Sequence, residues 1–367
     1  MKIAFVVNDI DFLLSHRKAL VLKAVQQGWE VFVLSDRSGT AKLPHTIQCY
    51  SIPIQRSSFG VKSNLKLLWK LNSYYRKIKP DIIHHITLKP IVFGTIAARL
   101  NFSNASIVNA VSGLGYLFTE QRSPIARLLL FLLWGCESKR VHYIFQNRID
   151  QKLFQKAGIA KQSIRIKGSG VDAKQFFQTA EPQSQTVCIL FTGRILRDKG
   201  IVEFLTVAKA IVNKGFDVHF KIHGKLDPEN PAHLPQEELE SYLQKDRISW
   251  DGYTNEVHKV LNACHIFCLP SYREGLPKSI VEALAVGRPV VTTTAPGCDD
   301  CVVEGINGYK VPVKDHLLLE KKLIQLIENK GIREKMGAAS RSFFEEGFTL
   351  KYVLKAHMEL YKQLIDK

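Results

Sequence analysis

Hydrophobic runs of strand length alternate with amphipathic segments of helix length along the whole chain. The predicted strands cover residues 2–8, 30–35, 81–87, 106–112, 142–147, 186–193, 218–224, 265–271 and 289–294. Short, continuous apolar runs are typical of strands buried on both faces, as in parallel sheets covered by helices. Helical segments of roughly 10–20 residues fill most gaps between these runs. The pattern therefore predicts an α/β fold with doubly wound parallel sheets.

The alternating pattern occurs twice, and the polar segment "GSGVDAKQFFQTAEPQSQ" (168–185) separates the two series. A chain of 367 residues is too long for one ordinary core and comfortable as two domains. We expect Rossmann-like domains over residues 1–172 and 173–348, with a helix over 349–367 that packs back on the first domain. Ligands of such sheets bind at the carboxyl ends of the strands, so we expect the site in the cleft that the two domains face.

Composition changes this picture mainly through charge. The chain has 51 Lys and Arg against 34 Asp and Glu, a net charge of +17. Such an excess favours anionic partners, namely nucleic acid, an acidic membrane surface or phosphorylated substrates. The apolar start is too short and too interrupted for a signal peptide, so we expect the mature protein to begin at Met1.

The seven cysteines lie scattered in apolar runs, which favours reduced thiols in the cytosol over a disulfide framework. The spacing of Cys264 and Cys268, and of Cys298 and Cys301, is compatible with zinc. The first pair, however, flanks a predicted buried strand, whereas zinc ligands lie on exposed loops. We therefore interpret these cysteines as structural and expect no metal.

Two glutamates stand on either side of a turn in "SYREGLPKSIVEALAVGRPVV" (271–291). Glu274 lies in a predicted strand-to-helix loop, and Glu282 lies inside the helix that starts near Pro277 and ends at Gly287. Both acids can face one elongated ligand with hydroxyls at two places. A nucleotide sugar is such a ligand, because its ribose and its sugar are separated by a diphosphate. Taken alone, the pair would be two solvated surface carboxylates.

A diphosphate requires cations, and "FTGRILRDKGI" (191–201) supplies them at the end of another predicted strand. Arg194 offers a planar fork to phosphate oxygens, and Lys199 offers a mobile point charge. Together they can stabilise a departing nucleoside diphosphate without a metal. The alternative is an ordinary basic loop in which Arg197 and Asp198 pair in solvent.

The segments "GRILRDKGI", "EGLPKSIVEALAVGRPVVTT" and "NGYKVP" resemble the second half of a family-4 glycosyltransferase of the GT-B fold. The junction "GSGVDAKQFF" and the segment "DIIHHITLKPIVFGTIAARL" extend the resemblance over nearly the whole chain. It implies a retaining hexosyltransferase that uses a nucleoside-diphosphate sugar, without cofactor or metal. By the same resemblance the base rests on backbone near residues 248–253. The implied catalytic residues are Glu274, Arg194 and Lys199, and the implied donor-binding residues are Glu282 for the ribose, Gly275, Leu276 and Gly193.

The first domain departs from the family pattern. The segment "NDIDFLLSHRKAL" stands where many relatives have a Gly-Gly loop, and Ser112 stands where many have a histidine. For His16 and His84, a purely structural role is an equal alternative to a catalytic one. We do not interpret the Asp9-x-Asp11 pair as a metal site, because it lacks partner acids. The acceptor-side candidates are His16 at a helix start, His84, Lys89, Ser112 and Gly113.

Two basic segments of the first domain bear on where the protein acts. Residues 56–80 hold seven basic residues and no acid, with Lys62, Lys66 and Lys70 on one face and an apolar stripe on another. Residues 122–140 contain an apolar run of seven flanked by arginines, too short to span a bilayer. Both can lie on an anionic membrane surface, and the alternative for each is a core-facing helix with a solvated basic side. The apolar stripe of residues 56–80 comprises Leu67, Leu71, Tyr74, Tyr75 and Ile78.

We therefore predict a cytoplasmic enzyme, peripheral on the inner face of a bacterial plasma membrane. It would transfer a hexose or N-acetylhexosamine, from a UDP-sugar, to a polyprenyl-diphosphate-linked saccharide in O-antigen, capsule or lipopolysaccharide synthesis. The acceptor follows from the resemblance of "HHITLKP" and "NAVSGLGYLF" to enzymes of surface-polysaccharide assembly. The alternatives are a GT-B sugar-nucleotide epimerase or phosphorylase-like enzyme, a catalytically silent partner subunit, and a nucleic-acid-binding protein. Nucleic acid is not expected, because the aromatic residues are not interleaved with the basic ones as stacking platforms.

Overall fold

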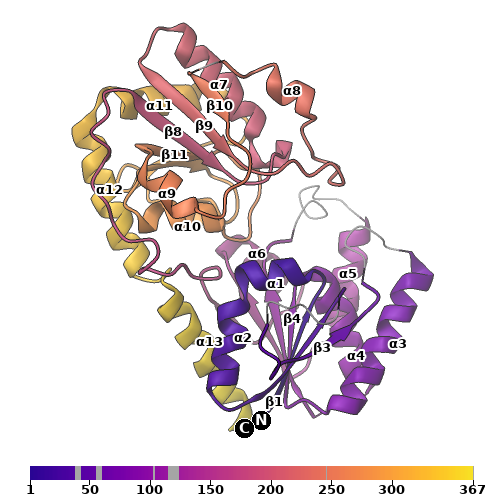
Figure 1. Ribbon diagram of the computed structural model, residues 1–367. Helices are drawn as coiled ribbons and strands as arrows, with labels where there is room; N and C mark the ends of the chain where they lie inside the picture. The colour runs from indigo at the N-terminus through magenta and orange to yellow at the C-terminus, as the bar shows by residue number, and fades with distance from the viewer. Residues whose placement is uncertain (38–42, 55–59, 102–103, 115–123, 245, 367) are drawn as a thin grey trace. The chain divides into compact units, whose positions relative to one another are not determined.

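The computed structural model describes residues 1–37, 43–54, 60–101, 104–114, 124–244 and 246–366 (Figure 1). Parts of three segments discussed above, residues 56–59, 115–118 and 122–123, lie outside this set. The chain divides into two compact units. The first unit comprises Met1–Ser169 and Tyr352–Lys367, and the second comprises Gly170–Lys351.

The first unit is built on a parallel sheet of seven strands in the order β3-β2-β1-β4-β5-β6-β7. The order reverses between β1 and β4, which pair in parallel, so the carboxyl ends of these two strands form the switch point of a doubly wound sheet. The strands are β1 (Lys2–Val7), β2 (Glu30–Ser35), β3 (Gln48–Ser51), β4 (Ile82–Ile86), β5 (Ser106–Val111), β6 (Val141–Phe145) and β7 (Ser163–Arg165).

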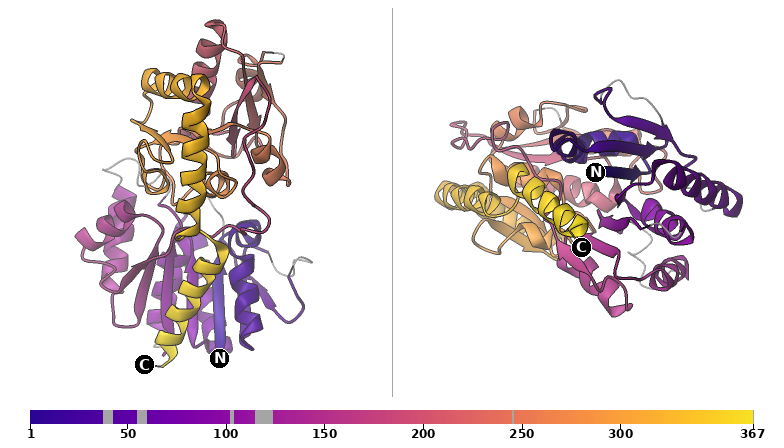
Figure 2. Two further views of the ribbon diagram at one scale, coloured as in Figure 1. Left: turned by 90° about the vertical axis from the view of Figure 1, so that its left-hand side faces the viewer. Right: turned by 90° about the horizontal axis from the view of Figure 1, so that it is seen from below.

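Helices cover both faces of this sheet. One face packs against α3, η1, α4, α5 and α6, and the other packs against α1, α2 and α13. Although α13 is last in the sequence, its residues from Tyr352 onward belong to the first unit, as the predicted fold requires (Figure 2). The helices are α1 (Ile10–His16), α2 (Lys18–Gln26), α3 (Val61–Ile78), η1 (Pro90–Gly94), α4 (Thr95–Leu100), α5 (Pro124–Gly135), α6 (Arg148–Lys156) and α13 (Leu350–Ile365).

The second unit is a parallel sheet of six strands in the order β10-β9-β8-β11-β12-β13, with one continuous apolar core. The strands are β8 (Val187–Thr192), β9 (Val218–His223), β10 (Ile248–Trp250), β11 (Ile266–Leu269), β12 (Val290–Thr293) and β13 (Gly308–Val311). The helices are η3 (Arg197–Lys199), α7 (Ile201–Asn213), α8 (Gln236–Glu240), α9 (Val257–Asn262), α10 (Lys278–Ala285), η4 (Asp299–Cys301), α11 (His316–Glu328) and α12 (Lys330–Glu345).

The predicted α/β class with two parallel sheets is confirmed, and the nine predicted strands end within two residues of those observed. The pattern missed β3, β7, β10 and β13. All four lie at an edge of a sheet and are only three or four residues long. Edge strands are short and partly solvated, so they lack the long apolar run that identifies a central strand.

The apolar stripe predicted on α3 faces the core of the first unit. Leu67, Leu71, Tyr75 and Ile78 are buried against the sheet. This corrects the interpretation of that stripe as membrane-facing and favours its alternative. None of the helices in the described part of the chain is long and apolar enough to cross a membrane.

The cysteines and the Asp9-x-Asp11 pair have local structural roles. Cys264 and Cys268 are wholly buried, and burial raises the pKa of both thiols. Asp9 caps α1 by accepting from the backbone N–H of Asp11 at 2.8 Å, and Asp11 forms an ion pair with Arg37 at 3.0 Å. The described residues contain no cluster of three or more His, Cys, Asp or Glu side chains arranged to hold a metal.

Candidate functional site

Two loops meet at the carboxyl edge of the second sheet. One follows β8 and leads through Arg194 to Lys199, and the other follows β11 and carries Glu274. Because β8 and β11 are paired neighbours, the loops that leave their carboxyl ends lie next to each other. The structure thereby brings together Lys199 and Glu274, which are 75 residues apart in the sequence.

Two side chains hold the Glu274 carboxylate, and one hydrogen bond holds its backbone. Its Oε1 forms an ion pair with Lys199 Nζ, and both side chains are largely buried. Ser271 Oγ lies 2.9 Å from the same Oε1 and 3.0 Å from the carbonyl oxygen of Asp198, so its single proton is shared between two acceptors. The backbone N–H of Glu274 donates to the carbonyl of Pro296 at 3.0 Å. The carboxylate is thus held in one orientation before any ligand arrives.

Two glycines with left-handed backbone allow the loops to approach this closely. Gly200 has φ of 74°, and a Cβ at this position would lie 2.1 Å from the carbonyl oxygen of Pro270. Gly297 has φ of 79°, and its Cβ would lie 2.5 Å from the carbonyl oxygen of Glu274. Neither position tolerates a side chain without movement of the neighbouring backbone.

The second predicted cation, Arg194, is held by an acid that sequence reasoning missed. Its Nη1 donates to Asp227 Oδ2 at 2.6 Å, and both side chains stay partly exposed. Burial raises the pKa of the nearby Asp198 carboxyl, while the charges of Lys199 and Arg194 oppose the rise and that of Glu274 adds to it. The five groups therefore form one electrostatic cluster in which cations and acids are interleaved.

The remaining predicted donor-binding residues lie on the loop and helix that follow Glu274. Gly275 and Leu276 continue the loop, and Glu282 is the fifth residue of α10. Glu282 is 7% exposed. Burial raises the pKa of its carboxyl, and Lys278, at 3.4 Å, opposes that rise. A buried acid one turn inside a helix has a high desolvation cost, which a ligand with hydroxyl donors can offset.

The segment predicted to support the base forms part of the same edge. Trp250 ends β10 and donates through Nε1 to the carbonyl of Gly224 at 3.0 Å. Lys225 lies 4.1 Å from the ring centroid of Tyr253, a half-exposed aromatic side chain. Gly193, after the end of β8, donates its N–H to the carbonyl of His223 at 3.0 Å, and Gly224 donates to the carbonyl of Gly252 at 2.8 Å, so the end of β9 connects this segment to the loop of Arg194.

Sequence reasoning missed Ser271 and Tyr272 as well as Asp227. Tyr272 donates to Glu203 Oε1 through its hydroxyl and to the carbonyl of Asp198 through its N–H. Ser271 stands three residues before Glu274 in the same loop, but nothing in the sequence marks its hydroxyl as a partner of that carboxylate. Asp227 follows β9 at the same carboxyl edge, but Glu229 lies in the same loop and nothing in the sequence marks which acid contacts Arg194.

In the first unit the structure contradicts the prediction that His84 faces an acceptor. His84 lies inside β4 with no exposed surface. Its Nδ1 is hydrogen-bonded to the hydroxyl of Tyr361, and its ring stacks on His357 with centroids 6.0 Å apart. Burial, followed by the charges of His357 and Arg17, lowers its pKa well below the usual value. His84 is therefore a core residue that fastens α13 to the sheet.

The other first-unit candidates lie nearer the carboxyl edge of their sheet. His16 is the last residue of α1 rather than the start of a helix, and its ring stacks on Phe12 with centroids 4.4 Å apart. Lys89 directly precedes η1, and burial lowers the pKa of its ammonium group. Ser112 and Gly113 follow β5, and Gly113 has φ of 117°.

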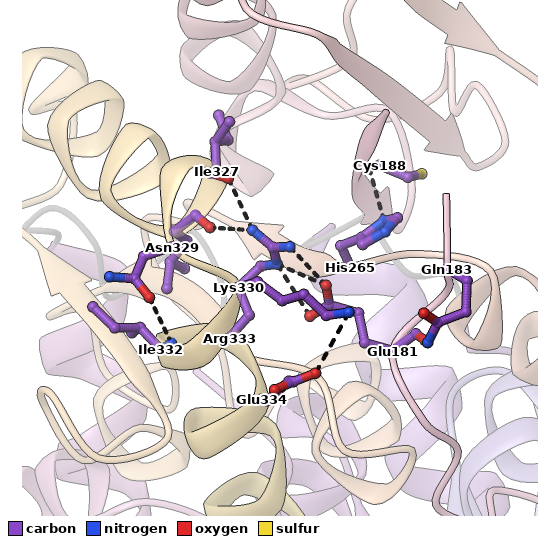
Figure 3. Close-up of polar contacts among 11 residues, drawn as sticks. Glu181, Gln183, Cys188, His265, Ile327, Asn329, Lys330, Ile332, Arg333 and Glu334 are labelled. Atoms are coloured by element: carbon purple, nitrogen blue, oxygen red, sulfur yellow. Dashed lines mark hydrogen bonds and ion pairs between the residues drawn. The ribbon is translucent and has the colours of Figure 1, made fainter. Parts of the chain in front are cut away.

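A cavity of about 180 Å³ lies at the opposite, amino edge of the second sheet, and Figure 3 shows polar contacts of some of its lining residues. Arg333 donates to both carboxylate oxygens of Glu181 and to the carbonyls of Leu326 and Ile327. Arg288, also in the wall, donates to several backbone carbonyls. These guanidinium groups bind residues 179–181 and so hold the segment before β8 in place. We therefore interpret the cavity as part of the packing between that segment and the sheet.

Comparison with known proteins gives a consistent result along both halves of the chain. Residues 172–343 match the family described as glycosyl transferases group 1, and residues 2–147 match the family described as glycosyl transferase 4-like.

Two relatives match over almost their whole length. The chain is 25% identical to the Staphylococcus aureus capsular polysaccharide biosynthesis glycosyltransferase CapM, covering 93% of this chain and 92% of CapM. It is also 25% identical to the Campylobacter jejuni N,N'-diacetylbacillosaminyl-diphospho-undecaprenol alpha-1,3-N-acetylgalactosaminyltransferase, covering 95% and 96%.

Two solved structures share the fold. Sucrose-phosphate synthase from Thermosynechococcus elongatus superposes with a TM-score of 0.81 at 19% identity, over 100% of this chain and 99% of that one. Anabaena HepE in complex with UDP and glucose superposes with a TM-score of 0.77 at 18% identity, over 99% and 100%.

Proposed function

The chain belongs to the group 1 glycosyltransferases and has the GT-B fold, and we propose that it transfers a sugar from a UDP-sugar to a lipid-linked saccharide. It is a hexosyltransferase related to enzymes of capsule and lipid-linked saccharide synthesis. The sugar is a hexose or N-acetylhexosamine, the acceptor is linked to a polyprenyl diphosphate, and the anomeric configuration is retained. UDP as the carrier is supported by HepE, a structural neighbour that holds UDP and glucose.

The observation that carries this proposal is the contact of Lys199 with Glu274 at the carboxyl edge of the second sheet. One group suits the diphosphate and the other suits sugar hydroxyls, and the two halves of such a donor are covalently joined. A site that recognises both must hold a cation beside an acid, as this one does. Lys199 and Arg194 stabilise the negative charge that grows on the departing diphosphate, and this stabilisation is strongest from groups already oriented.

The acids paired with these cations contribute to that orientation. Asp227 holds Arg194, and Glu274 holds Lys199, so neither side chain has to be ordered by the donor. Glu274 accepts hydroxyls of the donor sugar, with the amides of Gly275 and Leu276 beside it. Glu282 accepts the ribose diol, whose two hydroxyls suit a carboxylate.

The acceptor side belongs to the first unit in this proposal. The name of the Campylobacter jejuni relative specifies a saccharide on diphospho-undecaprenol as its acceptor. Such an acceptor is confined to a bilayer, so the protein works as a peripheral protein on the cytoplasmic membrane face. The candidates for contacting the acceptor are His16, Lys89, Ser112 and Gly113.

Thermal stabilisation tests the donor assignment. The purified protein is heated with UDP, GDP, UDP-glucose, UDP-galactose and their N-acetylated forms, at concentrations of about 100 times the Kd. A ligand that binds only the folded state adds about 2.7 kcal/mol at that concentration, which raises Tm by several degrees. We expect stabilisation by UDP and by at least one UDP-sugar.

A transfer assay tests the reaction. The stabilising UDP-sugar is incubated with a polyprenyl-diphosphate-linked saccharide, and mass spectrometry measures the product. One added hexose or N-acetylhexosamine with an unchanged anomeric configuration supports the proposal. Stabilisation by GDP alone would refute the UDP assignment, and release of UDP or an epimerised sugar without acceptor would favour the epimerase or phosphorylase alternative.

A further inference from the structure

The excess positive charge of the chain lies in one of its two units. The first unit contains 28 Lys and Arg against 10 Asp and Glu, a formal net charge of +18. The second unit contains 23 against 24, a net charge of −1. The second unit would bind the anionic donor under our proposal, yet it carries no excess. The charge of the first unit therefore serves a different partner.

Helix α5 in the first unit exposes an unusual number of large apolar side chains. Its inward face packs Ala126, Leu129 and Leu133 into the core. Its outward face leaves Phe131 65% and Trp134 55% exposed. Ile125 and Leu128 continue that outward face, at 41% and 56% exposure. A helix that is apolar all round is covered on its outer side by something other than water.

Helix α3, on the same face of the sheet, also exposes large apolar side chains. It carries Trp69, 70% exposed, and Leu65, 60% exposed. α3 packs against α4 and η1, and η1 in turn contacts α5, so these helices lie on one face of the sheet (Figure 1). We call the outward residues of α3 and α5 the apolar face, which comprises Leu65, Trp69, Ile125, Leu128, Phe131 and Trp134.

The two helices that carry the apolar face also carry positive charge. Within α3 the basic residues are Lys62, Lys66, Lys70, Arg76 and Lys77, and the helix contains no acid. Within α5 the exposed charged residue is Arg127, and this helix also contains no acid. Helices that expose large apolar side chains and carry Lys and Arg without acids are typical of protein surfaces that enter the headgroup region of anionic bilayers.

We propose that the apolar face inserts into the interfacial layer of an anionic bilayer, with the lysines and arginines of these helices on lipid phosphates. Its benefit to the enzyme depends on the proposed function, since a lipid-linked acceptor is reached from the same surface. The insertion itself is a property of the first unit and does not depend on catalysis. α5 has 12 residues and is too short to span the bilayer, so it lies in the interface.

A second copy of this chain is a less suitable occupant. A symmetric dimer would place the apolar face against itself and bring the lysines of one α3 near those of the other. Like charges placed opposite each other across an interface cost several kcal/mol. An anionic bilayer instead complements both the apolar residues and the charge.

Vesicle sedimentation tests the insertion. Wild type is compared with L128S/F131S on vesicles of phosphatidylcholine with 30% phosphatidylglycerol, in 0.1 M and 0.5 M NaCl. The matched control is I306S/L317S, which removes two equally exposed side chains from the second unit. We expect the partition coefficient of L128S/F131S between vesicles and buffer to fall at least about tenfold at both salt concentrations. The reason is that this variant lacks two apolar side chains that the lipid would otherwise remove from water. The control should bind like wild type.

The depth of α5 is read from Trp134 in a variant in which Trp29, Trp69 and Trp250 are replaced by Phe. Its emission should shift to the blue and be quenched by brominated lipid in anionic vesicles. Three results would overturn the proposal. They are an unshifted emission of Trp134, equal vesicle binding of L128S/F131S and wild type, and a wild-type dimer without vesicles that L128S/F131S does not form. UDP stabilisation of L128S/F131S separates the two proposals, because loss of insertion with intact donor binding leaves the proposed function standing.

Discussion

Replacement of Lys199 by alanine is the most direct test of the site. In the structure the ammonium group of Lys199 pairs with Glu274 Oε1, and the Glu274 side chain is only 12% exposed. The replacement has two consequences. It removes a cation that we assign to the departing diphosphate, and it leaves a largely buried carboxylate without its counter-charge.

The size of the effect follows from the nature of the lost group. Removal of one oriented electrostatic group lowers turnover by about 100- to 1000-fold, or about 2.7–4 kcal/mol. The replacement of Glu274 by glutamine should lower turnover by about as much, because a neutral amide accepts weaker hydrogen bonds from sugar hydroxyls than a charged carboxylate does. If each single variant loses about 100-fold and each group acts partly through the other, the double variant should lose about 1000-fold rather than the roughly 10,000-fold product of two independent losses.

The assay combines initial rates with calorimetry. K199A should weaken UDP binding as well as turnover, because Lys199 is assigned to the diphosphate. E274Q should keep its affinity for UDP, which lacks the sugar, and lose turnover. K214A is the matched control, because Lys214 forms a comparable ion pair with Glu320 elsewhere in the second unit. Its turnover should stay within about twofold of wild type, as expected for a surface pair.

Two results would refute this reasoning. Turnover of K199A within about threefold of wild type would remove Lys199 from the reaction. Multiplicative losses in the double variant would show that Lys199 and Glu274 act independently, in spite of their contact in the structure.

Three further predictions test the surroundings of the site and the fold. Ser271→Ala should lower kcat by about 10-fold or more, the worth of a hydrogen bond to a charged group, with UDP affinity unchanged; a loss of UDP affinity instead would show that the hydroxyl does not act through Glu274. Gly297→Ala should lower both turnover and Tm, because its Cβ would lie 2.5 Å from a backbone oxygen, whereas the control Gly305→Ala, with φ of 74° and nothing within 4 Å, should show backbone strain of about 1 kcal/mol only; equal effects of the two would contradict the close approach. His357→Leu tests a buried histidine whose pKa is lowered to about 3, so the wild-type fold keeps it neutral and loses stability as pH falls from about 6.5, where the unfolded chain takes up the proton. Urea unfolding at several pH values should show a dependence weaker by up to about 1.4 kcal/mol per pH unit in His357→Leu between about pH 6 and 4, and an unchanged dependence would show that this histidine is protonated in the fold.

The apolar pattern was sufficient to predict the central strands, because a strand buried on both faces has a local signature. Phe5 and His84 are register partners in β1 and β4, and both strands were predicted from runs of apolar residues. The roles of polar residues inside those runs were not local. The partner that makes His84 structural is Tyr361, 277 residues further along the chain. A histidine in a strand suggests chemistry until the helix that covers it is known.

The site shows the same limit. Glu274 and Lys199 were predicted together because each follows a strand at the carboxyl edge of one sheet, and that edge is a general property of parallel sheets. Asp227, which holds Arg194, was not predicted because nothing in its own segment marks it. The two groups that the sequence analysis assigned to the donor are in contact in the structure, whereas the groups that hold them in place became apparent only from the packing of neighbouring loops.

The separation of charge between the two units bears on how such an enzyme can manage two anionic substrates. A strongly positive second unit would attract phosphorylated molecules of many kinds through its long-range field. Cations that are paired with acids instead act mainly on a ligand in direct contact with them. Lys199 and Arg194 are paired in this way, so recognition of the donor depends on contact rather than on a long-range field. The first unit has the opposite need, because a bilayer is a large anionic surface that a net charge of +18 attracts from any direction. Electrostatic attraction alone does not fix the orientation of the unit on the bilayer. Insertion of the apolar face would fix it, because this face lies on one side of the unit. Under our proposal, charge brings the first unit to the bilayer, and Phe131, Trp134 and Trp69 determine which side faces it.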